Sequence, residues 1–101
     1  MTSPSDGIRS VVVDRDGVSV VVSEERWGHI VLGHPEIAEI EAEITAAIRT
    51  PEIVRDGRTV DEAWIYRRLA DGSRAPWLKV VVRYGEEGGR VVTAFLRRRV
   101  P

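Results

Sequence analysis

Hydrophobic and polar residues follow two different periods along this chain, and the changes between them divide it into three parts. Residues 11–13 and 18–22 are β-branched runs joined through Asp16-Gly17, a dipeptide that tolerates the positive φ angles of a tight hairpin turn. From residue 24 to residue 49, apolar side chains recur every three or four positions, which is typical of amphipathic helices. After Pro51 apolar and polar residues alternate, which predicts β-strands.

Two consecutive helices are predicted in the middle part. Ser23 offers an N-cap oxygen and Glu24 lies where the helix dipole favours negative charge, so the first helix should begin at Glu24. Gly33 and the following His34-Pro35 end it, because a residue before proline avoids the helical region. The second helix is expected over residues 36–49, where isoleucines recur at helical spacing at positions Ile37, Ile40, Ile44 and Ile48.

The alternating part predicts an antiparallel sheet. Three strands are expected over residues 63–69, 77–84 and 90–98, after a short strand at Ile53-Val54. Sequential strands with short connections pair antiparallel, and one of their two faces is apolar and of the size that two helices would cover. The predicted fold class is therefore α+β, with two N-terminal helices packed on one face of a four-stranded antiparallel sheet and preceded by a short β-hairpin at one edge.

The other face of the predicted sheet carries aromatic and cationic side chains. They are Trp64, Tyr66 and Arg68 on the first long strand, Trp77, Lys79 and Arg83 on the second, and Thr93, Phe95 and Arg97 on the last. Cations interleaved with aromatic rings can hold a phosphodiester backbone and stack its bases. A solvated face whose rings cover cationic stems is the alternative.

The two faces are also expected to differ in burial. We expect Lys79, Arg83 and Arg97 to be accessible together on the aromatic face. The residues expected to be buried on the other side are Ile37, Ile40, Ile44, Leu78, Val80 and Val82.

Length and composition limit the class of protein. A chain of 101 residues has room for one hydrophobic core, so we expect a flexible leader over residues 1–10 and a single domain over residues 11–101. The absence of cysteine excludes disulfides, thiolate nucleophiles and cysteine-based metal sites. No signal-like or bilayer-spanning segment is present, which favours a cytoplasmic protein without a membrane partner.

The net charge of −1 conceals an asymmetry between the two halves of the chain. Residues 1–50 carry four Arg against nine acidic residues, whereas residues 51–101 carry eleven Arg or Lys against seven acidic residues. The basic half is where a polyanion would bind.

The two histidines, His29 and His34, lie in the first helix and at the bend after it. Histidine titrates near pH ~6.5, so it can carry the proton that must leave the 2′-hydroxyl group when RNA is cleaved. The spacing of the pair matches no metal-binding motif, and we expect neither a metal nor a cofactor. For each histidine a capping or hydrogen-bonding role is the alternative.

Several short motifs occur in a recognisable order: Arg26-Trp27-Gly28-His29-Ile30, Gly33-His34-Pro35-Glu36-Ile37, Thr50-Pro51-Glu52-Ile53-Val54, Trp64-Ile65-Tyr66-Arg67-Arg68, Trp77-Leu78-Lys79-Val80-Val81-Val82 and Val91-Val92-Thr93-Ala94-Phe95-Leu96. Together they resemble the phage-associated branch of the barnase, EndoU, colicin and RelE-like nuclease superfamily, over about residues 23–101. The resemblance implies N-terminal helices against a four-stranded antiparallel sheet and metal-independent cleavage of RNA. Many members are toxins and others are phage-borne RNA-processing domains, so RNA and an acidic antitoxin or immunity protein are the expected partners.

The resemblance also implies a catalytic set, which consists of His34, His29, Lys79, Tyr66, Arg67 and Thr93. The other members of the aromatic and cationic face are expected to bind RNA, namely Arg68, Arg83, Arg97, Trp64, Trp77 and Phe95.

The expected reaction is transesterification. His34 takes the proton of the 2′-hydroxyl group, which attacks the adjacent phosphorus, while Lys79 with Arg67 or Arg97 stabilises the developing charge. Tyr66 or Thr93 orients the phosphate or donates to the leaving oxygen. Strand alternation places Arg67 on the opposite face from Tyr66 unless a bulge intervenes.

Two other functions fit the same sequence. A non-catalytic module would use the basic, aromatic face to bind nucleic acid or an acidic protein. A RelE-like toxin would cleave messenger RNA only on the ribosome. The sequence indicates no particular oligomeric state.

Overall fold

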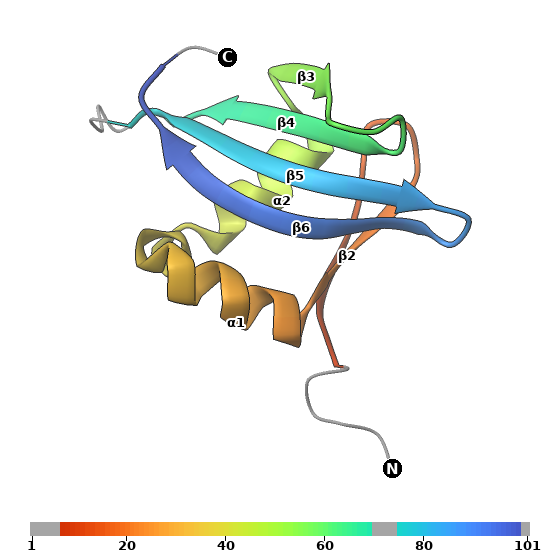
Figure 1. The fold of residues 1–101 in the computed structure, drawn as a ribbon, viewed down its shortest axis with the longest axis horizontal. Helices are drawn as coiled ribbons and strands as arrows, with labels where there is room; N and C mark the ends of the chain where they lie inside the picture. Colours follow the sequence, from red (N-terminus) through yellow and green to blue (C-terminus); the bar gives the residue numbers. More distant parts are fainter. Residues whose placement is uncertain (1–6, 70–74, 100–101) are drawn as a thin grey trace.

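The computed structural model describes residues 7–69 and 75–99, and within them the chain is an α+β domain (Figure 1). In this described part, six strands form one sheet in the order β1-β2-β6-β5-β4-β3. The elements in chain order are β1 (Ile8–Val13), β2 (Ser19–Ser23), α1 (Glu24–Gly33), the 3-10 helix η2 (Pro35–Glu39), α2 (Glu41–Arg49), β3 (Ile53–Asp56), β4 (Glu62–Arg68), β5 (Trp77–Gly85) and β6 (Gly88–Arg97).

The N-terminal hairpin extends the sheet. β2 pairs with β6 in parallel through Val20–Gly89 and Val21–Arg90, whereas the other neighbouring strands pair antiparallel. The close approach of β2 needs Gly88, which has a φ of +123° and lies where a Cβ atom would be 2.7 Å from the Ser19 carbonyl oxygen. The predicted antiparallel pairing of β4, β5 and β6 is confirmed, and the hairpin lies at one edge as predicted. The predicted number of strands is corrected from four to six, because the hairpin joins the same sheet, and alternation within a hairpin does not show which distant strand it joins.

The first helix was predicted correctly. α1 runs from Glu24 to Gly33, and the Ser23 side-chain oxygen accepts a hydrogen bond of 3.0 Å from the backbone N–H of Arg26. This bond satisfies one of the N–H groups that a helix start leaves without a helical partner.

The second predicted helix is divided in two. Ile40, with φ −125° and ψ 31°, separates η2 from α2. A 3-10 segment has about three residues per turn instead of 3.6, so the apolar positions before and after Ile40 are rotated relative to one another. As a result Ile37 and Ile44 are buried, while Ile40 is only partly buried, which corrects its expected placement in the core.

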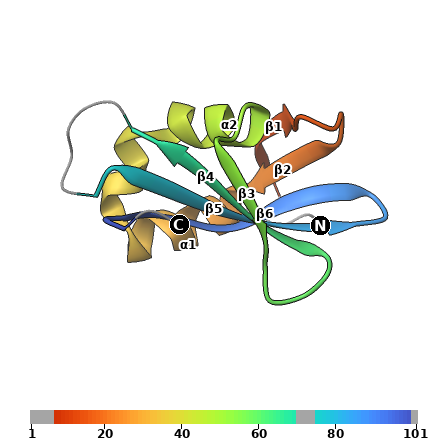
Figure 2. The same cartoon turned by 90° about the horizontal axis from the view of Figure 1, so that it is seen from above.

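The helices and one face of the sheet share a single hydrophobic core (Figure 1). α1 packs against β6 and β2, and α2 packs against β4, β5 and β1. Seen from above, α2 and β1 lie side by side (Figure 2). The predicted burial of the remaining core residues is confirmed for Ile37, Ile44, Leu78, Val80 and Val82.

Arg9 of β1 joins the hairpin to both helices. Its Nε and NH2 donate to the Glu41 carboxylate at 2.6 and 3.0 Å, and NH1 donates to Glu24 at 3.3 Å. The guanidinium also lies 4.7 Å from the centre of the Trp27 ring. The hydrogen bonds between Arg9 and Glu41 raise the pKa of Arg9 and lower the pKa of Glu41. The strand thus begins at Ile8, inside the predicted leader, of which residues 1–6 lie outside the described residues.

A second polar link holds the hairpin turn against the sheet. The Tyr84 hydroxyl donates to Asp14 Oδ2 at 2.8 Å, and Asp14 Oδ1 accepts backbone hydrogen bonds of 2.9 Å from Asp16 and Val18. Burial and the Asp14 carboxylate raise the pKa of Tyr84. Burial acts to raise the pKa of Asp14 too, but its hydrogen bonds from Val18, Tyr84 and Asp16 outweigh that effect and lower it.

Candidate nucleic-acid interface

The register of β4, β5 and β6 arranges the aromatic and cationic residues in rows across the sheet face opposite the core. Residues that pair directly across antiparallel strands have Cβ atoms about 5 Å apart, so each row is a set of neighbours. The rows in order along the face are Arg68–Trp77–Arg97, Tyr66–Lys79–Phe95, Trp64–Val81–Thr93 and Glu62–Arg83–Arg90.

Lys79 lies at the centre of this face, enclosed by aromatic rings. Its Nζ is 3.5 Å from the centre of the Trp64 ring, 5.5 Å from that of Phe95 and 5.8 Å from that of Tyr66. These are cation–π distances, and the rings leave Lys79 only 9% exposed. Lys79 is therefore on the predicted face but not accessible, because the rings attract its ammonium group and close over it.

Arg97 is the half-buried cation at the neighbouring position. Its guanidinium carbon lies 5.7 Å from the centre of the Tyr66 ring. Among the described residues, neither Arg97 nor Lys79 forms an ion pair with a carboxylate. The positive charge at the centre of the face is thus held by aromatic rings, which do not neutralise it.

His34 reaches this face from the bend after α1. Its imidazole stacks on the Phe95 ring, with the ring centres 5.5 Å apart and the planes inclined by 27°. The side chain is 41% exposed, and Nδ1 lies 3.8 Å from Glu36 Oε1. The tertiary structure thereby brings the histidine to the margin of the aromatic cluster around Lys79, a proximity that the sequence could not show.

His29 is not part of this cluster. Its side chain is 62% exposed on α1, and its ion pair within the described residues is with Glu25, at 4.0 Å. The two predicted catalytic histidines are thus in different environments, and of the two it is His34 that contacts the aromatic face.

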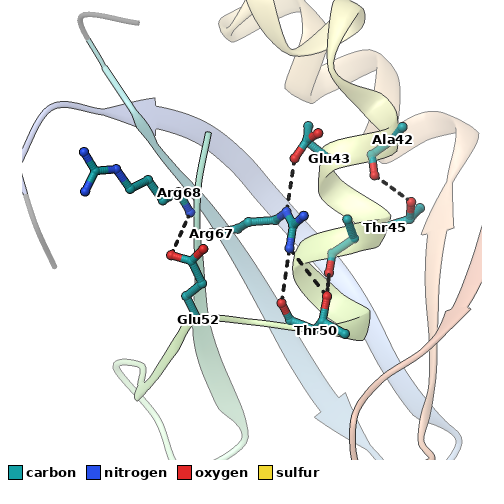
Figure 3. Close-up of polar contacts among 8 residues, drawn as sticks. Ala42, Glu43, Thr45, Thr50, Glu52, Arg67 and Arg68 are labelled. Carbon is teal, nitrogen blue, oxygen red and sulfur yellow. Dashed lines mark hydrogen bonds and ion pairs between the residues drawn. The ribbon is translucent and has the colours of Figure 1, made fainter. Parts of the chain in front are cut away.

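Arg67 is also separated from the other predicted catalytic residues. The β4–β5 register is regular from Glu62 to Arg68, so no bulge turns Arg67 toward the aromatic face. Its Nε donates to Glu43 Oε2 at 3.1 Å, and NH1 donates to the carbonyl oxygen and the hydroxyl of Thr50 at 3.4 and 3.5 Å. Figure 3 shows its side chain directed to α2 while that of Arg68 extends the other way. The expected placement of Arg67 beside Lys79 is therefore wrong.

The remaining predicted residues share the face but differ in exposure. Tyr66 is 2% exposed and Trp77 is 7% exposed, whereas Thr93 and Phe95 are half-buried. Arg68 and Arg83 are exposed, and Arg83 NH2 donates to Glu62 Oε2 at 3.3 Å.

Glu62 is a member of this face that the sequence analysis did not identify. Its Oε1 accepts a hydrogen bond of 2.9 Å from the indole Nε1–H of Trp64. That bond, together with bonds from the backbone of Arg58 and the side chain of Arg83, lowers the pKa of Glu62. The i, i+2 spacing from Trp64 was the available signal, because it places both side chains on one strand face.

Two open cavities adjoin the sheet. A groove of about 880 Å³ lies at the β5–β6 turn, where Arg26, Arg83 and Arg90 meet Glu86 and Asp61. A smaller cavity of about 240 Å³ lies on the helix side between Asp14, Tyr84, Ile48 and Val54. Neither cavity is lined by His34 or Lys79.

Within residues 7–69 and 75–99, no group of three or more His, Asp or Glu side chains is placed to hold a metal ion. None of the helices in these ranges combines the length and hydropathy that crossing a bilayer requires. Comparison of the chain with protein-family models, with curated proteins and with solved structures found no match.

Proposed function

We propose that this chain is a metal-independent endoribonuclease of the barnase, EndoU, colicin and RelE-like type. The observation that carries the proposal is the position of His34, which stacks on Phe95 at the margin of a sheet face whose central cations have no carboxylate partners among the described residues. A partly exposed imidazole beside uncompensated positive charge is suited to a phosphodiester with an adjacent hydroxyl group.

The proposed reaction needs few groups. His34 accepts the proton of the 2′-hydroxyl, the O2′–P bond forms and the P–O5′ bond breaks, which leaves a 2′,3′-cyclic phosphate. The leaving 5′-oxygen takes a proton from solvent, with a hydrogen bond from the half-buried Thr93 hydroxyl. Arg97 stabilises the charge on the phosphorane oxygens, because the rings around Lys79 stand between its ammonium group and a ligand.

The test is cleavage of naked single-stranded RNA in EDTA by the purified chain and two histidine variants. We expect cleavage with 2′,3′-cyclic ends, and no cleavage of DNA, because DNA lacks the attacking oxygen. His34→Ala should slow cleavage by at least about 100-fold, the usual contribution of a positioned base. His29→Ala is the matched comparison and should stay within about twofold, because His29 is exposed and paired with Glu25.

Equal rates for the two variants would remove His34 from the mechanism. A requirement for added divalent metal would exclude the proposed chemistry as a whole. Cleavage only when ribosomes are supplied would instead indicate a RelE-like enzyme.

A non-catalytic nucleic-acid-binding module is the second candidate, and the enclosure of Lys79 favours it. A lysine 3.5 Å above an indole ring already has a partner, which suits a rigid binding surface better than a mobile catalytic cation. Binding of RNA without cleavage, in the presence and absence of ribosomes, would support this candidate.

A further inference from the structure

We infer that the outer face of Trp64 is a nucleobase-stacking subsite, and that Glu62 and Lys79 are the residues that position its ring. The inference rests on the proposed function in one respect, which is that the ligand is RNA. It is independent of whether RNA is cleaved.

Two contacts of the Trp64 ring and one contact of its partner Glu62 carry the inference. Its Nε1–H donates to Glu62 Oε1 at 2.9 Å, which fixes one edge of the ring. Lys79 Nζ lies 3.5 Å from the ring centre, which occupies one of the two faces. Glu62 is in turn held by Arg83 at 3.3 Å. The Trp64 side chain is nevertheless only partly buried. Because Lys79 occupies one face of the ring, we assign the accessible part to the other face.

A ring held in this way is well suited to stacking. A flexible aromatic side chain loses conformational freedom when a base stacks on it, and a ring already fixed by its neighbours loses less. Because every base has a π-face, such a subsite would accept any base and would add affinity without sequence preference.

The position of Trp64 relative to His34 matches one short segment of a nucleic-acid strand. Trp64 is on β4 and Phe95 is on β6, with β5 between them, and both ring centres lie within 5.5 Å of Lys79 Nζ on β5. Lys79 contacts both rings, and His34 stacks on Phe95. A base on Trp64 would therefore belong to the same segment as the phosphodiester beside His34, and Arg97 and Arg68 supply charge complementary to its backbone.

This arrangement gives Lys79 a positioning role in place of direct contact with phosphate. If the role is correct, the cation matters for base-dependent affinity and can be replaced by another cation. A lysine that neutralised phosphate would instead affect ligands with and without bases alike.

The experiment measures binding of two uncleavable 2′-O-methyl oligonucleotides in EDTA by fluorescence anisotropy, one with bases and one with abasic positions. The wild-type chain should bind the base-containing strand about tenfold more tightly, as expected for one or two stacked bases. Trp64→Ala should make the two affinities equal. Trp27→Phe, which changes a buried tryptophan of α1, is the matched control and should preserve the ratio.

The positioning residues are tested on the same ratio. Lys79→Met and Glu62→Ala should each reduce the ratio of the two affinities severalfold. Lys79→Arg should keep the wild-type ratio, because it retains the cation. Should Trp64→Ala fail to fold, a Trp27→Phe/Trp77→Phe chain retains Trp64 as its single tryptophan, whose fluorescence should be quenched by the base-containing strand and not by the abasic strand.

A tenfold ratio that persists in Trp64→Ala, or the absence of any ratio in the wild-type chain, would overturn the inference. Cleavage of ordinary RNA is scored separately through His34→Ala. A chain that binds bases through Trp64 without cutting RNA would refute the nuclease proposal alone, and a chain that cuts RNA without this ratio would refute the subsite alone.

Discussion

The two faces of the sheet both carry cations, but these cations have different partners. On the helix side, Arg9 contacts Glu41 at 2.6 Å and Arg67 contacts Glu43 at 3.1 Å. On the aromatic face opposite the helices, Lys79 lies 3.5 Å from the Trp64 ring centre and Arg97 lies 5.7 Å from that of Tyr66. Arg83, on the same side, differs from these two because it pairs with Glu62.

The difference decides which face can attract a polyanion. A carboxylate cancels the charge of its partner, so the arginines of the helix side mainly join elements of the fold. An aromatic ring attracts a cation through its quadrupole and has no net charge to offset it. The aromatic face therefore retains positive charge in an ordered arrangement, which is the condition for binding a phosphodiester backbone.

The largest expected effect is the difference in stability lost when a side chain is truncated on each of the two faces. Leu78→Ala removes a fully buried side chain from the helix side and should lower the free energy of unfolding by about 2–5 kcal/mol. Phe95→Ala on the aromatic face should lower the free energy of unfolding by only about 1–2 kcal/mol, because part of the ring is already in water. It should nevertheless weaken RNA binding. Urea unfolding and RNA anisotropy measure the two effects. Equal losses of stability would mean that the aromatic face is a second core.

A smaller effect compares two arginines of opposite faces. Arg97→Gln should weaken RNA binding severalfold and reduce the slope of log affinity against log salt by about 0.7, the value for one lost contact with a single strand. Arg67→Gln should leave that slope unchanged and lower the free energy of unfolding by about 0.5–1 kcal/mol, because it loses its bonds to Glu43 and Thr50. A salt titration of each variant provides the measurement. A similar change of slope in both would show that the helix side also contacts RNA.

The smallest expected effect is the pH dependence of the stability that the Arg9–Glu41 pair contributes. The hydrogen bonds from Arg9 hold the pKa of Glu41 below its usual 4.5, so this pair stabilises the fold above that pH. The contribution is lost as the pH falls through the lowered pKa of the folded state. Glu41→Gln should therefore cost about 0.5–1 kcal/mol at neutral pH and almost nothing near pH ~3, as measured by urea unfolding. A cost that does not change with pH would mean that the Glu41 charge is not what stabilises this contact.

The sequence by itself determined the features that depend on local geometry. Ser23 and Gly33 bound the first helix as predicted, because capping and termination involve neighbouring residues. The division of β4, β5 and residues 93–97 of β6 into an apolar and an aromatic face was predicted as well, because successive side chains on a strand must point to opposite sides. A register shift opposite Val81 and Val82 changes the alternation earlier in β6, so that Val91 is buried in place of the expected Val92. The same rule already indicated that Arg67 would face away from Tyr66.

The tertiary structure alone decided which distant segments meet. No local pattern showed that β2 would join β6 in parallel or that the second helix would break at Ile40. Nor did any pattern show that His34 would stack on Phe95, or that Trp64 would enclose Lys79 from the neighbouring strand. These contacts depend on how elements far apart in the chain pack around a shared core, whereas periodicity and capping are fixed by the backbone within a few residues.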